Sequence, residues 1–77
     1  MKIIARNIAR EITEKDLRRE FSAFGEVSFI NLVWDRFDNK SAGFGVIEMP
    51  GLEEANSAIA GLDGKTLKGR NLTVKAV

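Results

Sequence analysis

The chain has 77 residues and a formal net charge of +1, so one small domain over residues 1–77 is expected, and the charge alone neither favours nor excludes nucleic acid. Because cysteine and histidine are both absent, we expect no enzyme, no metal and no cofactor, in an intracellular, cytoplasmic setting with a nuclear one left open. With 44% apolar residues and no run resembling a membrane span or a secretory signal, we expect a soluble protein without membrane contact whose fold begins at residue 1.

The first two elements are predicted to be a strand and a helix. Lys2–Arg6 is a short run rich in isoleucine and is followed by a turn former, which is typical of a buried strand. Thr13 stands three positions before Asp16, as in a capping box that begins a helix. A helix is therefore expected from about 14 to 24, and its core residues at helical spacing are Leu17, Phe21 and Phe24.

Two strands with a long loop between them are predicted next. Val27–Trp34 is rich in β-branched and aromatic residues, and residues 35–41 after it are polar and contain turn formers. Apolar residues resume in Gly43–Met49, and Pro50 marks the end of that strand.

A second helix and a last strand complete the chain. Glu53 and Glu54 suit a helix N-terminus, and the helix is expected to end near Asp63–Gly64. Its apolar face at helical spacing consists of Ala55, Ala58, Ile59 and Leu62. Leu72 and Val74 alternate with polar residues and predict a half-buried strand.

The order βαββαβ predicts an α+β, ferredoxin-like fold, in which a four-stranded antiparallel sheet carries both helices on one face. Alternation along each strand divides its residues between a covered and an open face. The residues expected on the open face are Lys2, Ile4, Arg6, Phe29, Asn31, Val33, Ala42, Phe44, Val46 and Glu48. Those expected to face the helices are Ile3, Ala5, Ile30, Leu32, Gly45, Ile47 and Met49. Trp34 has the parity of the covered face, which favours packing over ligand contact.

Two segments carry a family resemblance. Ala42–Met49 resembles the octamer of RNA-recognition motifs, basic-Gly-aromatic-Gly-aromatic-aliphatic-x-aromatic, and Ile3–Ile8 resembles their hexamer. The whole chain is similar to short, single-domain members of that family. The resemblance implies binding of single-stranded RNA on the open face, where aromatic rings stack on unpaired bases and the glycines between them leave backbone room. Single-stranded DNA is a further expected ligand in vitro.

The chain departs from the family pattern at three positions. Ile4 and Val46 stand where the pattern has stacking aromatics, and Ala42 replaces the leading basic residue. Phe44 remains. Since each stacking platform contributes about 1–3 kcal/mol, the loss of two predicts weak RNA binding of low specificity, micromolar or weaker.

Other residues on or near the face are expected to support binding. Phe29 and Arg6 offer alternative stacking surfaces, while Lys2, Lys75 and the loop cations offer contacts to phosphates. The predicted RNA-binding residues are Lys2, Ile4, Arg6, Phe29, Asn31, Arg36, Lys40, Phe44, Val46 and Lys75.

A second reading of the same face stays open. Ile4, Phe29, Phe44 and Val46 would together form an exposed apolar patch, which also suits a protein partner or a homodimer. Arg6, Lys2 and Lys75 also have a second interpretation, in which they bind no RNA and are ordinary solvated charges that protect an open sheet. The first expectation is a monomer that binds RNA. The sequence does not specify the base preference or any partner protein.

Overall fold

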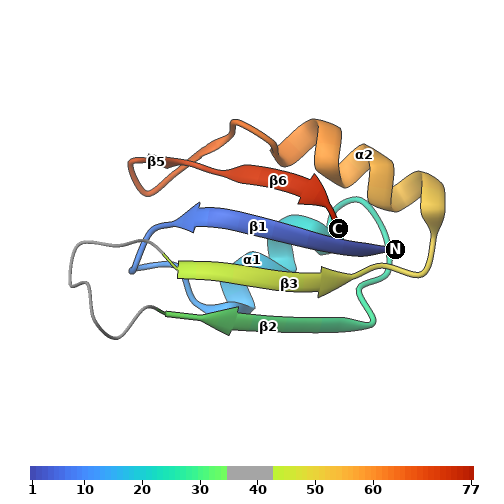
Figure 1. Cartoon of the computed structure of the whole chain (residues 1–77), viewed down its shortest axis with the longest axis horizontal. Helices are drawn as coiled ribbons and strands as arrows, with labels where there is room; N and C mark the ends of the chain where they lie inside the picture. Colours follow the sequence, from blue (N-terminus) through green and yellow to red (C-terminus); the bar gives the residue numbers. More distant parts are fainter. Residues whose placement is uncertain (35–42) are drawn as a thin grey trace.

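The computed structural model describes residues 1–34 and 43–77 and contains a four-stranded antiparallel sheet with two helices (Figure 1). The sheet order is β2-β3-β1-β6, so β1 and β3 are its central strands. The elements in chain order are β1 (Lys2–Ile8), α1 (Glu14–Ser22), β2 (Phe29–Val33), β3 (Gly43–Glu48), α2 (Leu52–Leu62), β4 (Thr66–Leu67), β5 (Arg70–Asn71) and β6 (Thr73–Ala76). The ferredoxin-like fold is therefore confirmed, and most element ends lie within one or two residues of those predicted.

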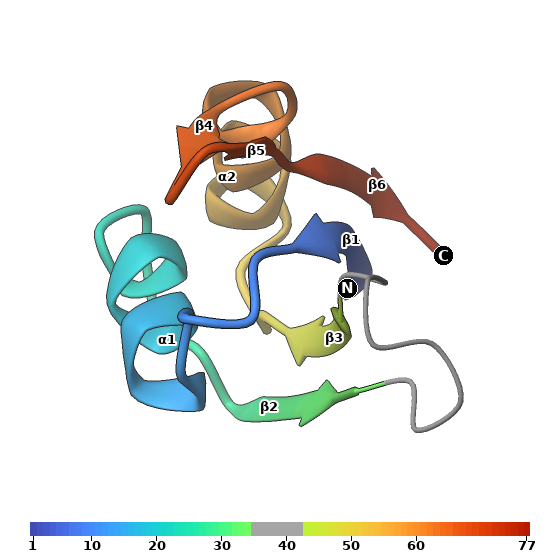
Figure 2. The same cartoon turned by 90° about the vertical axis from the view of Figure 1, so that its left-hand side faces the viewer.

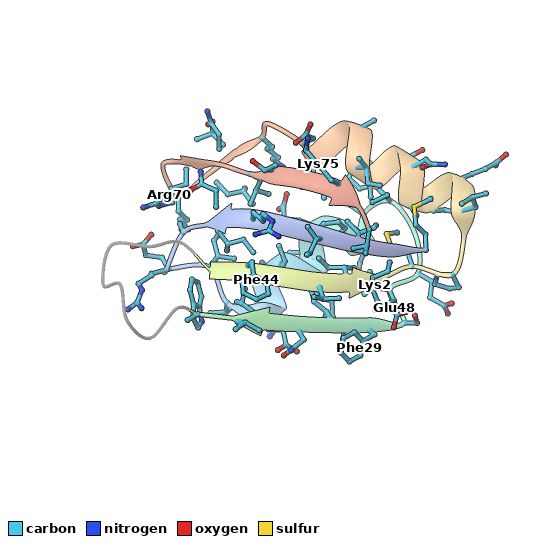
Figure 3. The ribbon with its side chains drawn as sticks, viewed as in Figure 1. Lys2, Phe29, Phe44, Glu48, Arg70 and Lys75 are labelled. Atoms are coloured by element: carbon cyan, nitrogen blue, oxygen red, sulfur yellow. The ribbon has the colours of Figure 1, made fainter. Side chains whose placement is uncertain are left out.

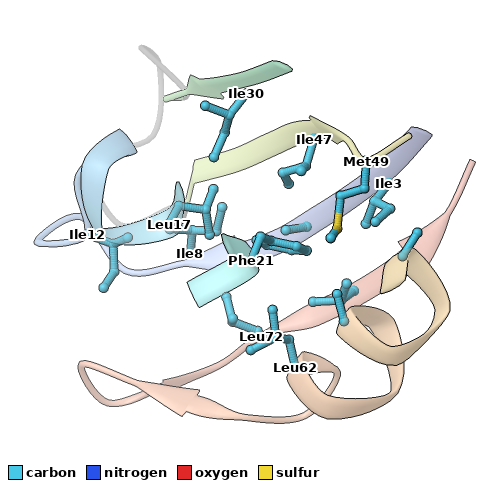
Figure 4. Close-up of a cluster of buried hydrophobic side chains, with 14 of the residues drawn as sticks. Ile3, Ile8, Ile12, Leu17, Phe21, Ile30, Ile47, Met49, Leu62 and Leu72 are labelled. Atoms are coloured by element: carbon cyan, nitrogen blue, oxygen red, sulfur yellow. The ribbon is translucent and has the colours of Figure 1, made fainter. Parts of the chain in front are cut away.

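Both helices lie on the same side of the sheet, and the opposite side is left uncovered (Figure 2). The predicted alternation is confirmed: the inward residues of β1 and β3 are buried and their outward neighbours are exposed or half-buried. The inward side chains pack with the apolar faces of the helices into one core (Figure 4). The largest fully buried side chains in it are Phe21, Ile3, Ile8, Leu17, Ile47, Met49, Leu62, Leu72 and Val74.

Helix α1 begins at the predicted capping box. The Thr13 hydroxyl accepts a hydrogen bond from the Asp16 N–H at 3.1 Å, and the Asp16 carboxylate accepts one from the Thr13 N–H at 3.1 Å. The backbone hydrogen bond from Thr13 lowers the pKa of Asp16, with a further contribution from the side-chain hydrogen bond. Leu17 and Phe21 are fully buried as predicted, and Phe24 packs half-buried against the core.

The hairpin of β4 and β5 was not predicted. Its turn has two residues with positive φ, Lys68 at 51° and Gly69 at 85°, as a tight hairpin with right-handed strand twist requires. The Asn7 amide connects this hairpin to the sheet: its Nδ2 donates to the carbonyl oxygen of Asn71 at 2.8 Å, and its Oδ1 accepts from Arg70 at 2.7 Å. Asn7 itself has a φ of 61°, at an irregularity that lets β1 continue to Ile8 instead of ending at residue 6.

The two chain ends lie at the same end of the sheet (Figure 1). The Met1 amine donates to the carbonyl oxygen of Met49 at 2.7 Å, and the Val77 N–H donates to the carbonyl oxygen of Lys2 at 3.0 Å. These hydrogen bonds extend the pairing of β1 with β3 to Met1 and the pairing of β1 with β6 to Val77.

Neither helix in the described ranges, 1–34 and 43–77, is long and apolar enough to cross a membrane.

Candidate nucleic-acid interface

The register of the sheet arranges the outward side chains of the open face into three rows, with consecutive rows about 7 Å apart along the strands (Figure 3). The end row consists of Phe29, Glu48 and Lys2. The middle row consists of Asn31, Val46, Ile4 and Lys75. The Phe44 row consists of two pairs, Val33 with Phe44 on β2 and β3 and Arg6 with Thr73 on β1 and β6, which meet at the irregularity in the pairing of β1 with β3.

Phe44 presents its ring to solvent from a central strand, with 38% of the residue exposed. Its two glycine neighbours face the other way and are buried. A Cβ on Gly45 would lie 2.8 Å from Leu17 Cδ2, and one on Gly43 would collide with the Trp34 ring. The backbone room that the glycines were predicted to leave is thus taken up on the covered side, by Leu17 of α1 at Gly45 and by the Trp34 ring at Gly43.

The middle row is apolar at its centre and polar at its ends. Ile4 and Val46 lie directly opposite each other on the two central strands, and both are half-buried. Asn31 on β2 and Lys75 on β6 are exposed at the two ends of the row. This centre is flat and hydrophobic but offers no ring on which a base could stack.

The end row combines an aromatic ring with two opposite charges. Phe29 is 46% exposed, more than Phe44, and lies opposite Glu48, which in turn lies opposite Lys2. All three side chains are exposed. The sequence indicated that these residues share a face, but only the strand register shows that they share one row.

Positive charge exceeds negative charge on the described part of the open face. Lys2, Arg6 and Lys75 are its cations, and Glu48 is its carboxylate. Thr73 is a further outward polar residue: it has the same parity as Lys75 in the predicted alternation, but it was not among the predicted binding residues, which on this strand included only the cation. The predicted positions Arg36, Lys40 and Ala42 lie outside the described residues.

Trp34 lies at the end of β2 on the helix side. It is half-buried and packs against the hydrophobic core, which confirms the packing prediction. The Arg10 guanidinium lies 5.9 Å from the centroid of the Trp34 ring, within the range of a cation–π contact. Trp34 therefore adds no stacking surface to the open face.

The sequence of the chain matches a model of a known family, the RNA recognition motif, over residues 3–73. The chain belongs to this family. The match extends from β1 into β6 and so includes every strand of the four-stranded sheet. Within this match, β3 presents the exposed Phe44 between two buried glycines.

Relatives and solved structures agree with this assignment. The chain is 40% identical over 75 residues to the 28 kDa ribonucleoprotein of Nicotiana sylvestris chloroplasts, covering 97% of this chain and 27% of that protein. A crystal structure of RNA Binding Protein PG1 superposes with a TM-score of 0.87 at 32% identity, covering 100% of this chain and 93% of that one. The RNA recognition motif of Rna15, solved with bound RNA (GU), superposes with a TM-score of 0.84 at 26% identity, covering 99% and 81%.

Proposed function

We propose that this chain binds single-stranded RNA on the open face of its sheet, with weak affinity and low overall specificity. The observation that carries the proposal is the exposed Phe44 ring, held on a central strand of an uncovered sheet. Membership of the RNA recognition motif family supports it, as does the similarity of the chain to a motif solved with bound RNA. Single-stranded DNA would occupy the same face in vitro, because base stacking does not depend on the sugar.

The weakness of binding follows from the middle row. Ile4 and Val46 provide apolar contact but no ring, and each missing stacking platform removes about 1–3 kcal/mol. Two missing platforms correspond to roughly one to four orders of magnitude in affinity. Arg6 on β1 and Phe29 in the end row offset part of this loss, since a guanidinium plane and an aromatic ring both stack on bases.

The surrounding cations give the binding a dependence on salt. Lys2, Arg6 and Lys75 border the face, and each phosphate contact to a single strand contributes about −0.7 to the slope of log affinity against log salt. Contacts from all three would give a slope of about −2. The predicted loop cations Arg36 and Lys40 would add to it.

An RNA titration followed by amide chemical shifts tests the proposal. Addition of a random-sequence RNA oligomer should shift the amides of the Phe44 row and the middle row, and repeating the titration at higher salt should weaken binding along the slope above. Shifts confined to α1 and α2 would contradict a site on the open sheet. No shifts at low salt would contradict RNA binding itself.

A second candidate function is contact with a protein through the same face. It is favoured by the apolar patch of Ile4, Phe29, Phe44 and Val46 on an uncovered sheet. We place it second, because three cations surround the patch, and propose a monomer. Molecular mass measured against concentration tests this: a rise toward twice the mass would favour self-association through the sheet. We also propose an intracellular location, for which fractionation of cells is the test.

A further inference from the structure

The end row brings three complementary chemical groups to one end of the open face. Lys2 lies opposite Glu48, and Glu48 lies opposite Phe29, so an ammonium, a carboxylate and an aromatic ring follow one another across β1, β3 and β2 (Figure 3). Directly opposite side chains have Cβ atoms about 4.5–5.5 Å apart. The three groups therefore lie within the reach of a single nucleotide.

Glu48 is paired with a neighbouring strand on each side. Its side chain is exposed, while its carbonyl oxygen accepts from the Ser28 N–H at 2.9 Å and from the Ser28 hydroxyl at 3.1 Å. These hydrogen bonds hold the end of β3 against the start of β2. A carboxylate fixed on a surface that otherwise attracts phosphates weakens non-specific RNA binding, so a compensating role in recognition is worth testing.

The chemistry of a carboxylate favours one base. A carboxylate only accepts hydrogen bonds, and its two oxygens accept best from two parallel N–H donors. Guanine alone has two adjacent donors on its Watson–Crick edge, N1–H and the N2 amino group. Adenine and cytosine place an acceptor beside the amino donor, and uracil places carbonyl oxygens on both sides of its N–H.

The arrangement of the row suits this pairing. A base stacked on the Phe29 ring extends its edge over the neighbouring strand β3, where Glu48 is the outward residue opposite Phe29. Lys2, opposite Glu48 on its other side, supplies positive charge for the phosphate of the same nucleotide. Ring, carboxylate and ammonium thus each meet a different part of a guanosine nucleotide.

We propose that the end row is a guanine subsite and that Glu48 is the residue that selects guanine. The inference rests on the proposed RNA binding. It adds a preference for one base at one position to a surface that otherwise has little selectivity for base sequence. Phe29 is the stacking platform of this subsite and lies outside the hexamer and octamer segments.

The test compares three short RNA oligomers of equal length by fluorescence anisotropy: oligouridine, and oligouridine with one central guanosine or one central adenosine. We expect the guanosine oligomer to bind wild-type protein roughly tenfold tighter than the other two. Glu48→Gln should remove this difference, because an amide presents one donor and one acceptor. It should leave binding of oligouridine at least as strong, since a negative charge is removed.

Glu53→Gln is the matched control. It makes the same change of charge on helix α2, away from the open face, and should keep the preference for guanosine. Amide spectra of both variants report whether the fold is retained. Phe29→Ala should bring the affinity for the guanosine oligomer down to that for oligouridine.

The outcomes separate this inference from the function on which it rests. Measurable but equal affinities of the wild type for all three oligomers would overturn the guanine subsite and leave RNA binding intact. A guanosine preference that persists in Glu48→Gln would overturn the role of Glu48. No binding of any oligomer would overturn both the subsite and the proposed function.

Discussion

The two faces of the sheet are built from alternate residues of the same strands, yet they obey different constraints. Ile47 on β3 is fully buried under the helices, while its neighbours Val46 and Glu48 point to the open side. On the covered face every described inward residue of β1 and β3 is apolar or glycine, because the helices must be packed without voids. On the open face rings, aliphatic groups and both signs of charge occur together.

Along a single strand, residues that stabilise the fold therefore alternate with residues that are available to a ligand. Substitutions on the covered face should act on stability, because they open cavities in the core. Substitutions on the open face should act on ligand affinity, because their side chains have few packing partners to lose. Two of the three departures of this chain from the octamer and hexamer patterns, Ile4 and Val46, lie on the open face, and the third, Ala42, lies outside the described residues.

The largest expected effect compares two adjacent residues of β3. Ile47→Ala should lower the free energy of unfolding by about 2–5 kcal/mol, because the buried side chain leaves a cavity. Val46→Ala is the matched truncation on the open face, and it should cost much less than Ile47→Ala. Urea denaturation followed by circular dichroism measures both. Equal losses would mean that the two faces are not energetically distinct.

Removal of the Phe44 ring should have the next largest effect. This effect should be on RNA affinity and not on the free energy of unfolding. Phe44→Ala should weaken RNA binding by about 1–3 kcal/mol, which is roughly five- to 150-fold and brings a weak site below ready detection. Leu52→Ala, an exposed apolar truncation on α2, is the control and should leave affinity unchanged. Anisotropy titrations measure the affinities. Unchanged affinity in Phe44→Ala would refute the role of the ring.

Restoring rings to the middle row should produce a gain of at least about tenfold in affinity, the lower end of the range for two stacking platforms. Ile4→Phe combined with Val46→Phe rebuilds the two platforms of the family pattern, on residues that face each other across the central strands. Calorimetric titration with oligouridine measures the gain, with the Phe44→Ala background as a check that the new rings act at the same site. An affinity that does not rise would show that bases do not reach the middle row.

The smallest expected effect lies at the start of α1, on the layer that covers the sheet. Thr13→Ala removes the hydroxyl half of the capping box and keeps the backbone N–H that donates to Asp16, and it should lower the free energy of unfolding by about 1 kcal/mol without changing RNA affinity. Because folding lowers the pKa of Asp16, this carboxylate stabilises the fold above its unfolded pKa, and the contribution is lost as the pH falls through the lowered value. Thr13→Ala keeps the backbone hydrogen bond that lowers this pKa most and loses only the smaller side-chain contribution, so stability measured between about pH 5 and pH 2 should fall only slightly less steeply than in wild type.

The sequence predicted what depends on local patterns. The Thr13 and Asp16 pair marked the start of α1, and the alternation of polar and apolar residues assigned Ile3 and Ile47 to the covered face and Phe44 to the open face. These features can be predicted from the sequence because the spacing of apolar residues and the capping of a helix each depend on a few neighbouring residues. The order of the elements, together with the rules for short and right-handed connections, then predicted the four-stranded sheet with both helices on one face.

Features that depend on distant segments were not predicted. The β4–β5 hairpin has strands of two residues, too short to alternate, and its Lys68–Gly69 turn lacks the usual asparagine or aspartate signal. The positive φ of Asn7 serves hydrogen bonds to residues more than 60 positions away. The end row likewise needed the register of three strands before Glu48 could be seen beside Phe29.

The adjacent chain ends have a practical consequence for labelling. Since Val77 pairs with Lys2, a fluorescent protein or affinity tag fused to either terminus would project from the same end of the molecule as Phe29 and Glu48. Such a fusion would crowd that end and leave the surroundings of Phe44 open. Measurements of nucleotide selectivity are best made on untagged protein, or on protein carrying a dye on an exposed residue of α2.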